Sequence, residues 1–321
     1  MRFQRFLVTG GAGFIGSHLV DRLLAAGAQV VVVDEFNDYY DPAIKRANVA
    51  PHLASERYTL VEADIRDRAR MQALAREHAP EVVIHLAARA GVRPSVEDPY
   101  LYQTTNVEGT LNMLDAARRA GVKRFVFGSS SSVYGVNDKV PFAERDPILR
   151  AASPYAATKV AGEALCSSFT HLYDMPSVSL RFFTVFGPRQ RPDLAIRKFA
   201  ELLRAGHGIQ LYGDGSSSRD YTYVGDIVDG IVAAAELDST GHEIFNLGNS
   251  TPTTLLELVR TIEDVLGVTA KIEWLPTQPG DVPRTFADLE KSRARLGYEP
   301  KTSLRDGIVE MVRWLDARAT A

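Results

Sequence analysis

Short, continuous runs of apolar residues alternate with longer amphipathic stretches over roughly the first 180 residues. The runs cover residues 6–8, 30–33, 58–61, 82–84, 125–127 and 178–180. Strands that are apolar throughout are buried on both faces, as in a parallel sheet covered by helices. Between the runs, positions such as Ile15, Leu19 and Leu23 recur with helical spacing. This β–α alternation predicts an α/β fold with a doubly wound parallel sheet.

After about residue 185 the spacing of the apolar residues changes, and most stretches have the spacing of helices. They cover residues 195–205, 224–237, 255–266 and 304–317, with turns at Gly213-Asp214-Gly215 and Gly280-Asp281. No Pro/Ser-rich linker separates the two parts. We therefore expect a sheet domain over residues 1–185. Residues 186–321 should form a smaller, mostly helical, substrate-binding domain packed on it, with some exchange of strands or helices between the two.

Composition and charge exclude several classes of protein. The chain has 321 residues, of which 45% are hydrophobic, and its net charge of −3 draws it neither to nucleic acid nor to anionic lipid. A single cysteine, Cys166, cannot form an internal disulfide, which favours a reducing, cytoplasmic location. No apolar run reaches the ~18 residues of a membrane span. We also expect no signal peptide, no metal site, and neither a nucleic-acid nor a membrane partner.

A glycine-rich turn follows the first predicted strand and opens a predicted helix. In Thr9-Gly10-Gly11-Ala12-Gly13-Phe14-Ile15-Gly16, the glycines fit both Gly-x-x-Gly-x-x-Gly and Gly-x-Gly-x-x-Gly spacings. The N–H groups of such a helix start can bind a pyrophosphate; a tight turn without a ligand is the alternative. The second strand ends in Asp34, whose carboxylate can accept bonds from both ribose hydroxyls and repels a 2′-phosphate. This order predicts a Rossmann-type site for NAD rather than NADP, with contacts from Gly10, Gly13, Phe14, Ile15 and Gly16.

Further candidates for the cofactor site follow the next two strands. Asp64 and Ile65 can bracket an adenine, although Asp64 is nearly as well suited to cap a helix. Leu86, Ala87 and Ala88 follow the fourth strand, where small residues either let the dinucleotide pass closely or permit tight helix packing. The predicted cofactor contacts also include Asn37, Asn106, Tyr155 and Lys159.

Tyr155 and Lys159 are four residues apart, so on a helix they share one face. An ammonium beside a phenol lowers the pKa of the phenol from ~10, and a cationic nicotinamide acts in the same direction. The phenolate is then a general base for an alcohol whose hydride leaves to the cofactor. A shared helix face without chemistry is the alternative. Ser129-Ser130-Ser131-Ser132 follows the fifth strand, where a serine can hydrogen-bond the reacting hydroxyl or merely belong to a loop.

Other motifs extend over the whole chain. After the serines comes Val133-Tyr134-Gly135, and Arg219-Asp220-Tyr221-Thr222-Tyr223-Val224 and Pro279-Gly280-Asp281 follow in the second half. With Gly10-x-x-Gly13-x-x-Gly16 and Tyr155-x-x-x-Lys159, they resemble the nucleotide-sugar epimerases of the extended short-chain dehydrogenase/reductase family. Three stretches are similar to UDP-glucuronate 4-epimerases in particular: Phe36-Asn37-Asp38-Tyr39-Tyr40-Asp41-Pro42, Ala90-Gly91-Val92-Arg93, and Arg181-Phe182-Phe183-Thr184-Val185-Phe186-Gly187-Pro188 with Arg191-Pro192-Asp193.

The resemblance implies an enzyme that epimerises a UDP-sugar at carbon 4. Hydride passes to tightly bound NAD, the 4-keto sugar rotates, and hydride returns to its other face. The resemblance assigns catalysis to Ser130, Tyr155 and Lys159. Ser131 and Ser132 align with an Asp-Glu pair of related 4,6-dehydratases, whose chemistry needs a base and an acid that serines cannot supply. The family resemblance also implies a homodimer that forms through helices around residues 107–119 and 154–172. The apolar faces of these helices could equally be buried in the core of a single chain.

The resemblance also implies contacts with the nucleotide. Arg219 aligns with an arginine that binds the diphosphate, although a surface pair with Asp220 is the alternative. Asp281 aligns with an acid that binds the uridine ribose, or is only a turn residue. Galactose-type epimerases have a second diphosphate arginine where this chain has Gln278, and Arg284 is the nearby substitute.

We expect the carboxylate at carbon 6 of the sugar to bind Thr184, Arg191 and the serines Ser130, Ser131 and Ser132. Arg93 is a further candidate, although a place at the start of a helix or in a salt bridge would explain this residue equally well. A charge-assisted bond of ~1.5–3 kcal/mol corresponds to a ~10–100-fold preference over a neutral sugar. Arg189-Gln190 replaces the usual Trp-Gly, which leaves the shape of the loop open.

We favour conversion of UDP-glucuronate to UDP-galacturonate. The alternatives are a UDP-glucose/UDP-galactose or broad-specificity 4-epimerase, a UDP-glucuronate decarboxylase, and a non-catalytic NAD-binding sensor.

Overall fold

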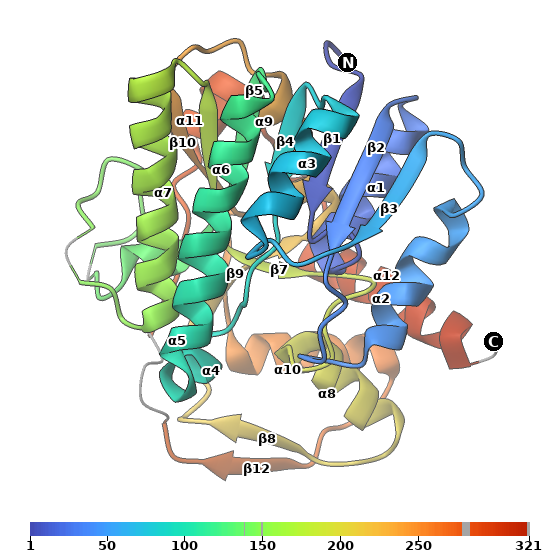
Figure 1. The fold of residues 1–321 in the computed structure, drawn as a ribbon. Coiled ribbons are helices and arrows are strands. Elements are labelled where there is room, and N and C mark those ends of the chain that lie inside the picture. The colour runs from blue at the N-terminus through green and yellow to red at the C-terminus, as the bar shows by residue number, and fades with distance from the viewer. Residues whose placement is uncertain (138, 149, 278–282, 320–321) are drawn as a thin grey trace.

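The computed structural model describes residues 1–137, 139–148, 150–277 and 283–319. Its centre is a seven-stranded, wholly parallel sheet in the order β10-β6-β5-β4-β1-β2-β3 (Figure 1). The strands are β1 (Arg5–Thr9), β2 (Gln29–Asp34), β3 (Tyr58–Glu62), β4 (Val82–His85), β5 (Arg124–Ser130), β6 (Ser177–Phe182) and β10 (His242–Leu247). Each of the six apolar runs lies in a strand, so the predicted doubly wound sheet is confirmed.

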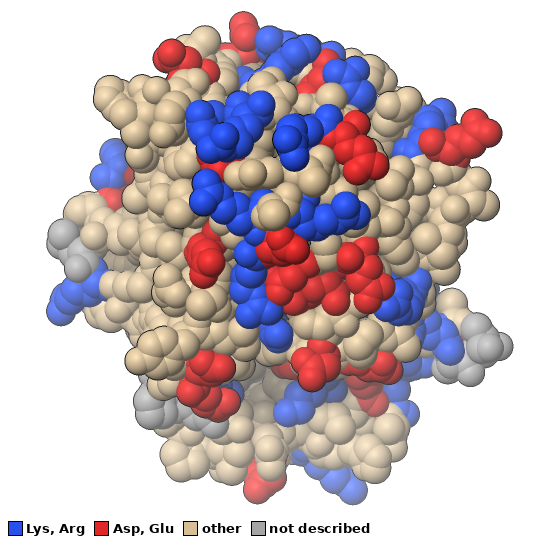
Figure 2. All heavy atoms as spheres, viewed as in Figure 1, with Lys and Arg blue, Asp and Glu red and all other residues tan. Residues whose placement is uncertain are grey.

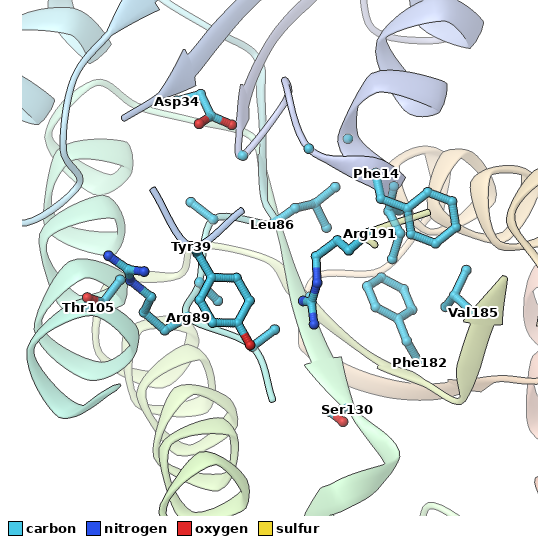
Figure 3. A pocket seen from close by; sticks show the side chains of 18 of the residues that line it. Phe14, Asp34, Tyr39, Leu86, Arg89, Thr105, Ser130, Phe182, Val185 and Arg191 are labelled. Carbon is cyan, nitrogen blue, oxygen red and sulfur yellow. The ribbon is translucent and has the colours of Figure 1, made fainter. Parts of the chain in front are cut away.

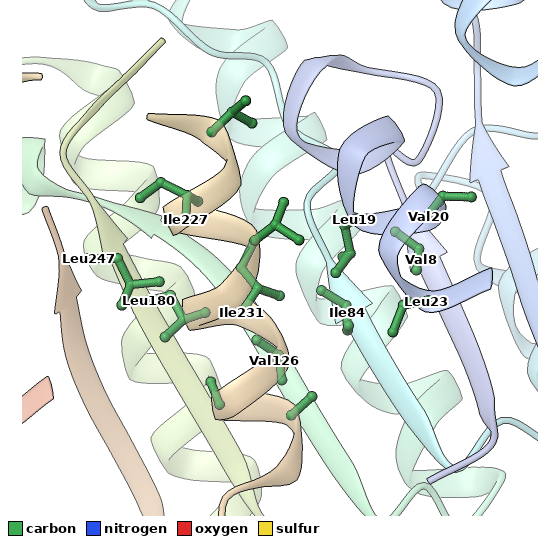
Figure 4. Close-up of a cluster of buried hydrophobic side chains, with 14 of the residues drawn as sticks. Val8, Leu19, Val20, Leu23, Ile84, Val126, Leu180, Ile227, Ile231 and Leu247 are labelled. Atoms are coloured by element: carbon green, nitrogen blue, oxygen red, sulfur yellow. The ribbon is translucent and has the colours of Figure 1, made fainter. Parts of the chain in front are cut away.

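Helices cover both faces of the sheet. On one face lie α3 (Arg68–His78), α6 (Gly109–Arg119) and α7 (Pro154–Tyr173), and on the other α1 (Phe14–Ala25) and α9 (Val224–Glu236). Figure 4 shows Leu19 and Leu23 of α1 and Ile227 and Ile231 of α9 directed at buried strand residues such as Val126. Burying one such side chain contributes about 1.5–3 kcal/mol, so this layer stabilises the sheet that carries the site.

The second half of the chain contributes to the main sheet and also builds layers of its own. Although α9 and β10 both lie beyond residue 185, β10 is an edge strand of the main sheet and α9 packs on one face of that sheet. The other strands are β7 (Thr184–Phe186), β9 (Ser218–Tyr223) and β11 (Pro252–Thr254) in one small sheet, and β8 (Ile209–Tyr212) and β12 (Ile272–Leu275) in another. Around them lie α8 (Ala195–Arg204), α10 (Leu255–Leu266) and α12 (Leu304–Ala319). A division into two domains at residue 185 stays a prediction.

The remaining elements are short. They are α2 (Pro42–Val49), α4 (Val92–Glu97), α5 (Pro99–Tyr102), α11 (Glu290–Leu296), the 3-10 helices Ala50–His52 and Ser131–Tyr134, and a π-helical turn over Gln103–Glu108. None of the described helices is long and apolar enough to cross a membrane.

Charged side chains of both signs mix over the face that carries α3 and α6 (Figure 2). Asp115 of α6 lies 3.2, 2.8 and 3.0 Å from Arg68, Arg118 and Arg119, respectively. Burial opposes ionisation of this carboxyl, but its hydrogen bonds to the arginines hold its pKa below the usual range. The arginines on this face are therefore partly neutralised by the acid between them.

A buried ion pair joins α7 to the sheet. The Nε and Nη2 atoms of Arg181 in β6 donate to Glu163 in α7 at 2.9 and 2.8 Å, and both side chains are almost fully buried. The Ser129 hydroxyl donates to the same carboxylate at 2.6 Å. This pair positions the helix that carries Tyr155 and Lys159 against the end of β5.

We expect Glu163→Gln to destabilise the protein strongly, because Arg181 would remain as a buried charge without its partner. The free energy of unfolding should fall by about 3–5 kcal/mol in urea titration. The matched control is Glu299→Gln, at the exposed Arg293–Glu299 pair, where the loss should stay below about 1 kcal/mol. Equal losses in the two variants would show that burial gives the pair no special weight.

Candidate active site

The carboxyl ends of strands β1 to β6 all reach one cavity of about 340 Å³. Parallel strands place these ends at the same edge of a sheet, where ligands bind in folds of this kind. Figure 3 shows part of the lining. The predicted site residues that line the cavity are Gly10, Gly13, Phe14, Ile15, Gly16, Asp34, Asn37, Ile65, Leu86, Ala87, Ala88, Ser130, Tyr155, Lys159, Thr184 and Arg191.

The glycine turn is shaped by close backbone contacts. Gly10 has φ +70°, and a Cβ there would lie 2.8 Å from the Ala87 nitrogen. A Cβ on Gly16 would lie 2.2 Å from the Gly10 carbonyl oxygen. Helix α1 starts after Gly13 without a side-chain cap, so its first N–H groups are available to an anion at the cavity wall. The turn therefore fits a pyrophosphate.

Asp34 is buried at the end of β2 and bound on both oxygens. It accepts bonds from the Ala12 and Phe36 nitrogens at 3.3 and 3.0 Å, and from Lys45 Nζ at 3.1 Å. Lys45, on α2, also lines the cavity and was not among the predicted site residues. Its place on a polar helix 11 residues beyond Asp34 gives no local indication of this pairing. A ribose bound here would meet an ion pair rather than a lone carboxylate.

Two predicted cofactor residues do not line the cavity. Asp64 pairs with Arg66, whose Nε donates to it at 2.8 Å, and α3 is capped by Asp67 instead. Asn106 is buried and accepts from the Arg89 nitrogen at 2.8 Å, while its amide donates to the Arg89 carbonyl at 2.9 Å and to Thr158 Oγ1 at 3.0 Å. Asn106 thus ties the loop after β4 to α7, the helix that carries Tyr155 and Lys159.

Tyr155 and Ser130 both line the cavity, and their side chains share a hydrogen bond. Ser130 Oγ accepts bonds from the nitrogen and the hydroxyl of Ser132 at 3.2 and 3.0 Å, which leaves its own hydrogen for Tyr155. Burial raises the pKa of Tyr155, whereas its hydrogen bond with Ser130 and the charge of Arg191 lower it. This is the arrangement of a phenol that can be activated as a base once the charge around it changes.

Lys159 does not act on Tyr155 as we expected from the sequence. Its ammonium donates to the Gly128 carbonyl at 2.7 Å and lies 5.9 Å from the centre of the Tyr155 ring. Burial lowers the pKa of Lys159 to about 8. The pKa of Tyr155 lies above its ordinary value, because the effect of burial is larger than the effects that lower it. The lowering effects come from Ser130 and Arg191. In the protein without cofactor, the prediction that Lys159 brings the pKa of Tyr155 below its ordinary value is therefore wrong.

Arg191 enters the cavity from the loop after β7, whereas Thr184 lies at the start of that strand. The loop shape, which the sequence left open, is held by Gln190. Its side-chain amide donates to the Val185 carbonyl at 3.0 Å, and its Oε1 accepts from the Arg197 nitrogen in the first turn of α8 at 3.2 Å. Polar contacts of Gln190 thus define the loop that presents Arg191.

Two residues that line the cavity were not predicted as site residues. One lies within a stretch that resembles UDP-glucuronate 4-epimerases, and the other lies directly before such a stretch. Tyr39 and Arg89 both line the cavity. The guanidinium carbons of Arg89 and Arg191 lie 5.8 and 5.2 Å from the centre of the Tyr39 ring (Figure 3). Tyr39 belongs to the stretch 36–42 and Arg89 directly precedes Ala90, so the family-like stretches themselves were the available indication.

Four further predicted substrate residues, Ser131, Ser132, Arg93 and Arg219, are not among the residues that line this cavity. Ser131 and Ser132 form the start of the 3-10 helix after β5. Arg93 lies with its guanidinium carbon 5.1 Å from the centre of the Tyr212 ring in β8. Asp281 and the alternative Gln278 fall outside the described residues.

Arg219 belongs to β9, and its Nη1 donates to the Ser218 carbonyl at 2.9 Å. The alternative Arg219–Asp220 pair is not found, because Asp220 accepts from the nitrogens of Asn249, Ser250 and Ala287 at 2.7, 3.0 and 3.0 Å. Arg284 forms a β-bridge with Ser218, the residue that precedes Arg219 in β9. Within the described part of the chain, no group of acidic, histidine or cysteine side chains is arranged to hold a metal.

Comparison with known proteins extends the likeness over almost the whole chain. Residues 7–311 match a family model described as GDP-mannose 4,6 dehydratase. A probable UDP-glucuronate 4-epimerase of Rhizobium meliloti is 39% identical over 98% of this chain and 97% of its own length.

Two solved structures agree with that result. The UDP-glucuronic acid 4-epimerase of Bacillus cereus, solved with UDP-glucuronic acid and NAD, is 34% identical, with a TM-score of 0.92 over 98% of this chain and 99% of its own. The UDP-glucose 4-epimerase of Thermotoga maritima, solved with UDP-glucose, is also 34% identical, with a TM-score of 0.90 over the same shares of the two chains. With the glycine turn, Ser130, Tyr155 and Lys159 gathered at one cavity, these matches show that the chain belongs to the extended short-chain dehydrogenase/reductase family.

Proposed function

We propose that this protein is an NAD-dependent 4-epimerase of UDP-sugars that interconverts UDP-glucuronate and UDP-galacturonate. The observation that carries the proposal is the position of Arg191 in the same cavity as Tyr155 and Ser130, close enough that its charge affects the pKa of Tyr155. A cation at this place can bind a 6-carboxylate while the tyrosine acts on the neighbouring hydroxyl. The Bacillus cereus relative, solved with UDP-glucuronic acid and NAD, supports the same assignment.

The cofactor would lie along the wall formed by the glycine turn. The open N–H groups at the start of α1 would bind its pyrophosphate, and the Asp34–Lys45 pair its adenosine ribose. Asn37, Ile65, Leu86, Ala87 and Ala88 line the same wall. When bound, the oxidised nicotinamide accepts a hydride and its positive charge favours a phenolate nearby.

Tyr155 would remove the proton of the 4-hydroxyl, helped by Ser130, as the hydride leaves carbon 4. The ammonium of Lys159, held by the Gly128 carbonyl and 5.9 Å from the centre of the Tyr155 ring, would stabilise the phenolate once it has formed. The 4-keto sugar then turns to present its other face, and Tyr155 returns the proton as the hydride comes back. The sugar therefore ends inverted at carbon 4 with no net oxidation.

Ser131 and Ser132 support an epimerase within a family whose model is described as a dehydratase. Elimination across carbons 5 and 6 needs a base and an acid, and these hydroxyls supply neither near neutral pH. Loss of carbon dioxide from the 4-keto intermediate would make the protein a decarboxylase instead. A carboxylate kept charged by Arg191 and hydrogen-bonded by Thr184 and Ser130, which line the same cavity, would be held against that reaction.

We further propose that Arg219 of β9 and Arg284, which bridges the preceding residue Ser218, bind the UDP diphosphate, and that Asp281 binds the uridine ribose. A homodimer through α6 and α7 completes the proposal. Leu111 of α6 is 42% exposed, and Leu172 and Tyr173 of α7 are 61% and 46% exposed. These helices therefore offer apolar surface to a second copy of the chain.

Tyr155→Phe tests the catalytic assignment. Because phenylalanine cannot take the proton, turnover of UDP-glucuronate should fall by ~10²–10⁴-fold, measured by NMR of the products. NAD binding should persist, measured by titration of the cofactor-free protein. Full turnover by this variant would remove the basis of the mechanism, and an inactive parent chain that binds NAD would indicate a sensor.

Arg191→Ala tests the carboxylate assignment. The ratio of kcat/KM for UDP-glucuronate over UDP-glucose should fall by ~10–100-fold, because one charge-assisted bond is lost. Arg93→Ala is the matched control, since Arg93 lies on Tyr212 outside the cavity, and its ratio should stay within twofold. An unchanged ratio in Arg191→Ala would favour a UDP-glucose or broad-specificity epimerase.

A further inference from the structure

Arg191 is paired with a carboxylate of its own chain. Its Nε and Nη2 atoms donate to the two oxygens of Asp193 at 3.0 and 2.8 Å. The Arg191 side chain is 16% exposed and that of Asp193 is 46% exposed. A guanidinium so deeply placed requires a counter-charge. Asp193 supplies it from the rim, while Arg191 lines the cavity (Figure 3).

The ion pair with Asp193 occupies only one edge of the Arg191 guanidinium, so another edge can bind a second acceptor. A guanidinium has five N–H donors in a planar fork, so pairing through Nε and Nη2 leaves the N–H groups at its Nη1 end for a second acceptor. A sugar carboxylate that binds there would share Arg191 with Asp193. Two carboxylates on one cation carry a net negative charge, so each weakens the hold of the other.

The backbone of this loop has separate anchors. Gln190 binds the Val185 carbonyl and the Arg197 nitrogen, and Arg189 lies 2.8 Å from Asp21 of α1. None of these contacts involves Asp193. The effect of Asp193 on a ligand therefore passes through the charge of Arg191 and not through the path of the loop.

We propose that Asp193 is a positioning residue that sets how strongly Arg191 holds a 6-carboxylate and takes the guanidinium back when the 4-keto sugar turns. The inference rests on the proposed epimerase function. A buried cation without a second partner would hold the carboxylate in one orientation, because separating such a pair leaves both charges bare. With Asp193 beside it, Arg191 keeps a partner throughout the rotation. The Arg191–Asp193 pair thus lowers the affinity for the 6-carboxylate and makes release and rotation of the sugar easier.

Asp193→Asn tests this inference because it keeps the size of the side chain and removes its charge. In NAD-loaded protein carrying Tyr155→Phe, so that no conversion occurs, the Kd for UDP-glucuronate should fall about tenfold and that for UDP-glucose should change less than about twofold. In the chain with Tyr155 intact, KM and kcat for UDP-glucuronate should both fall by about three- to tenfold, because release and rotation become slower. Asp193→Glu, which restores the charge, should move all values back toward those of the parent.

Two further variants separate the possible outcomes. Asp238→Asn removes one negative charge from an exposed pair with Arg2 and should leave both Kd values unchanged. In an Arg191→Ala background, Asp193→Asn should no longer alter the ratio of the two affinities. If Arg191→Ala itself leaves the ratio unchanged, the proposed carboxylate site fails. If Arg191→Ala lowers the ratio but Asp193→Asn weakens UDP-glucuronate binding or leaves it within twofold, Asp193 only orients Arg191 and this inference is overturned.

Discussion

All strands of the central sheet run in the same direction, and the site depends on this constraint. Parallel pairing brings the carboxyl ends of β1 and its two neighbours, β2 and β4, to one edge. The space between β1 and β4 at this edge is also sterically limited, since a Cβ on Gly10 would lie only 2.8 Å from the Ala87 nitrogen. Residues distant in the chain, such as Gly16, Asp34 and Ser130, therefore border one cavity without any long loop to carry them there.

The charged side chains at the cavity are buried, and a buried charge requires a partner of opposite charge. Three ion pairs lie at or just behind the cavity wall: Asp34–Lys45, Glu163–Arg181 and Arg191–Asp193. The first pair lies at the predicted ribose site, and the second fixes α7, the helix that carries Tyr155 and Lys159. The third keeps a cation near Tyr155 without leaving it bare. Each pair lets a charged group occupy a position where an unpaired charge would be too costly.

Segments of the second half of the chain are joined to one another by buried carboxylates that accept hydrogen bonds from backbone nitrogens. Asp220 holds the turn at residues 249–250 and the segment at Ala287, and Asp226 accepts from the Lys301 and Thr302 nitrogens at 3.1 Å each. Backbone N–H groups that enter the interior need such acceptors. The segments that carry Arg219 and Arg284 are thereby placed beside each other, which the order of the motifs alone did not show.

The amino-acid sequence by itself determined the features that depend on short-range periodicity and backbone sterics. The apolar runs marked the strands, the glycines marked the turn after β1, and the spacing of Tyr155 and Lys159 placed both on one helix. Only the tertiary structure decided which charges meet: Lys45 with Asp34, Asp193 with Arg191, and Lys159 with the Gly128 carbonyl. It also decided that the pKa of Tyr155 lies above its ordinary value in the protein alone. The reason is that desolvation and counter-charge depend on everything packed around a group, whereas a motif records only its neighbours along the chain.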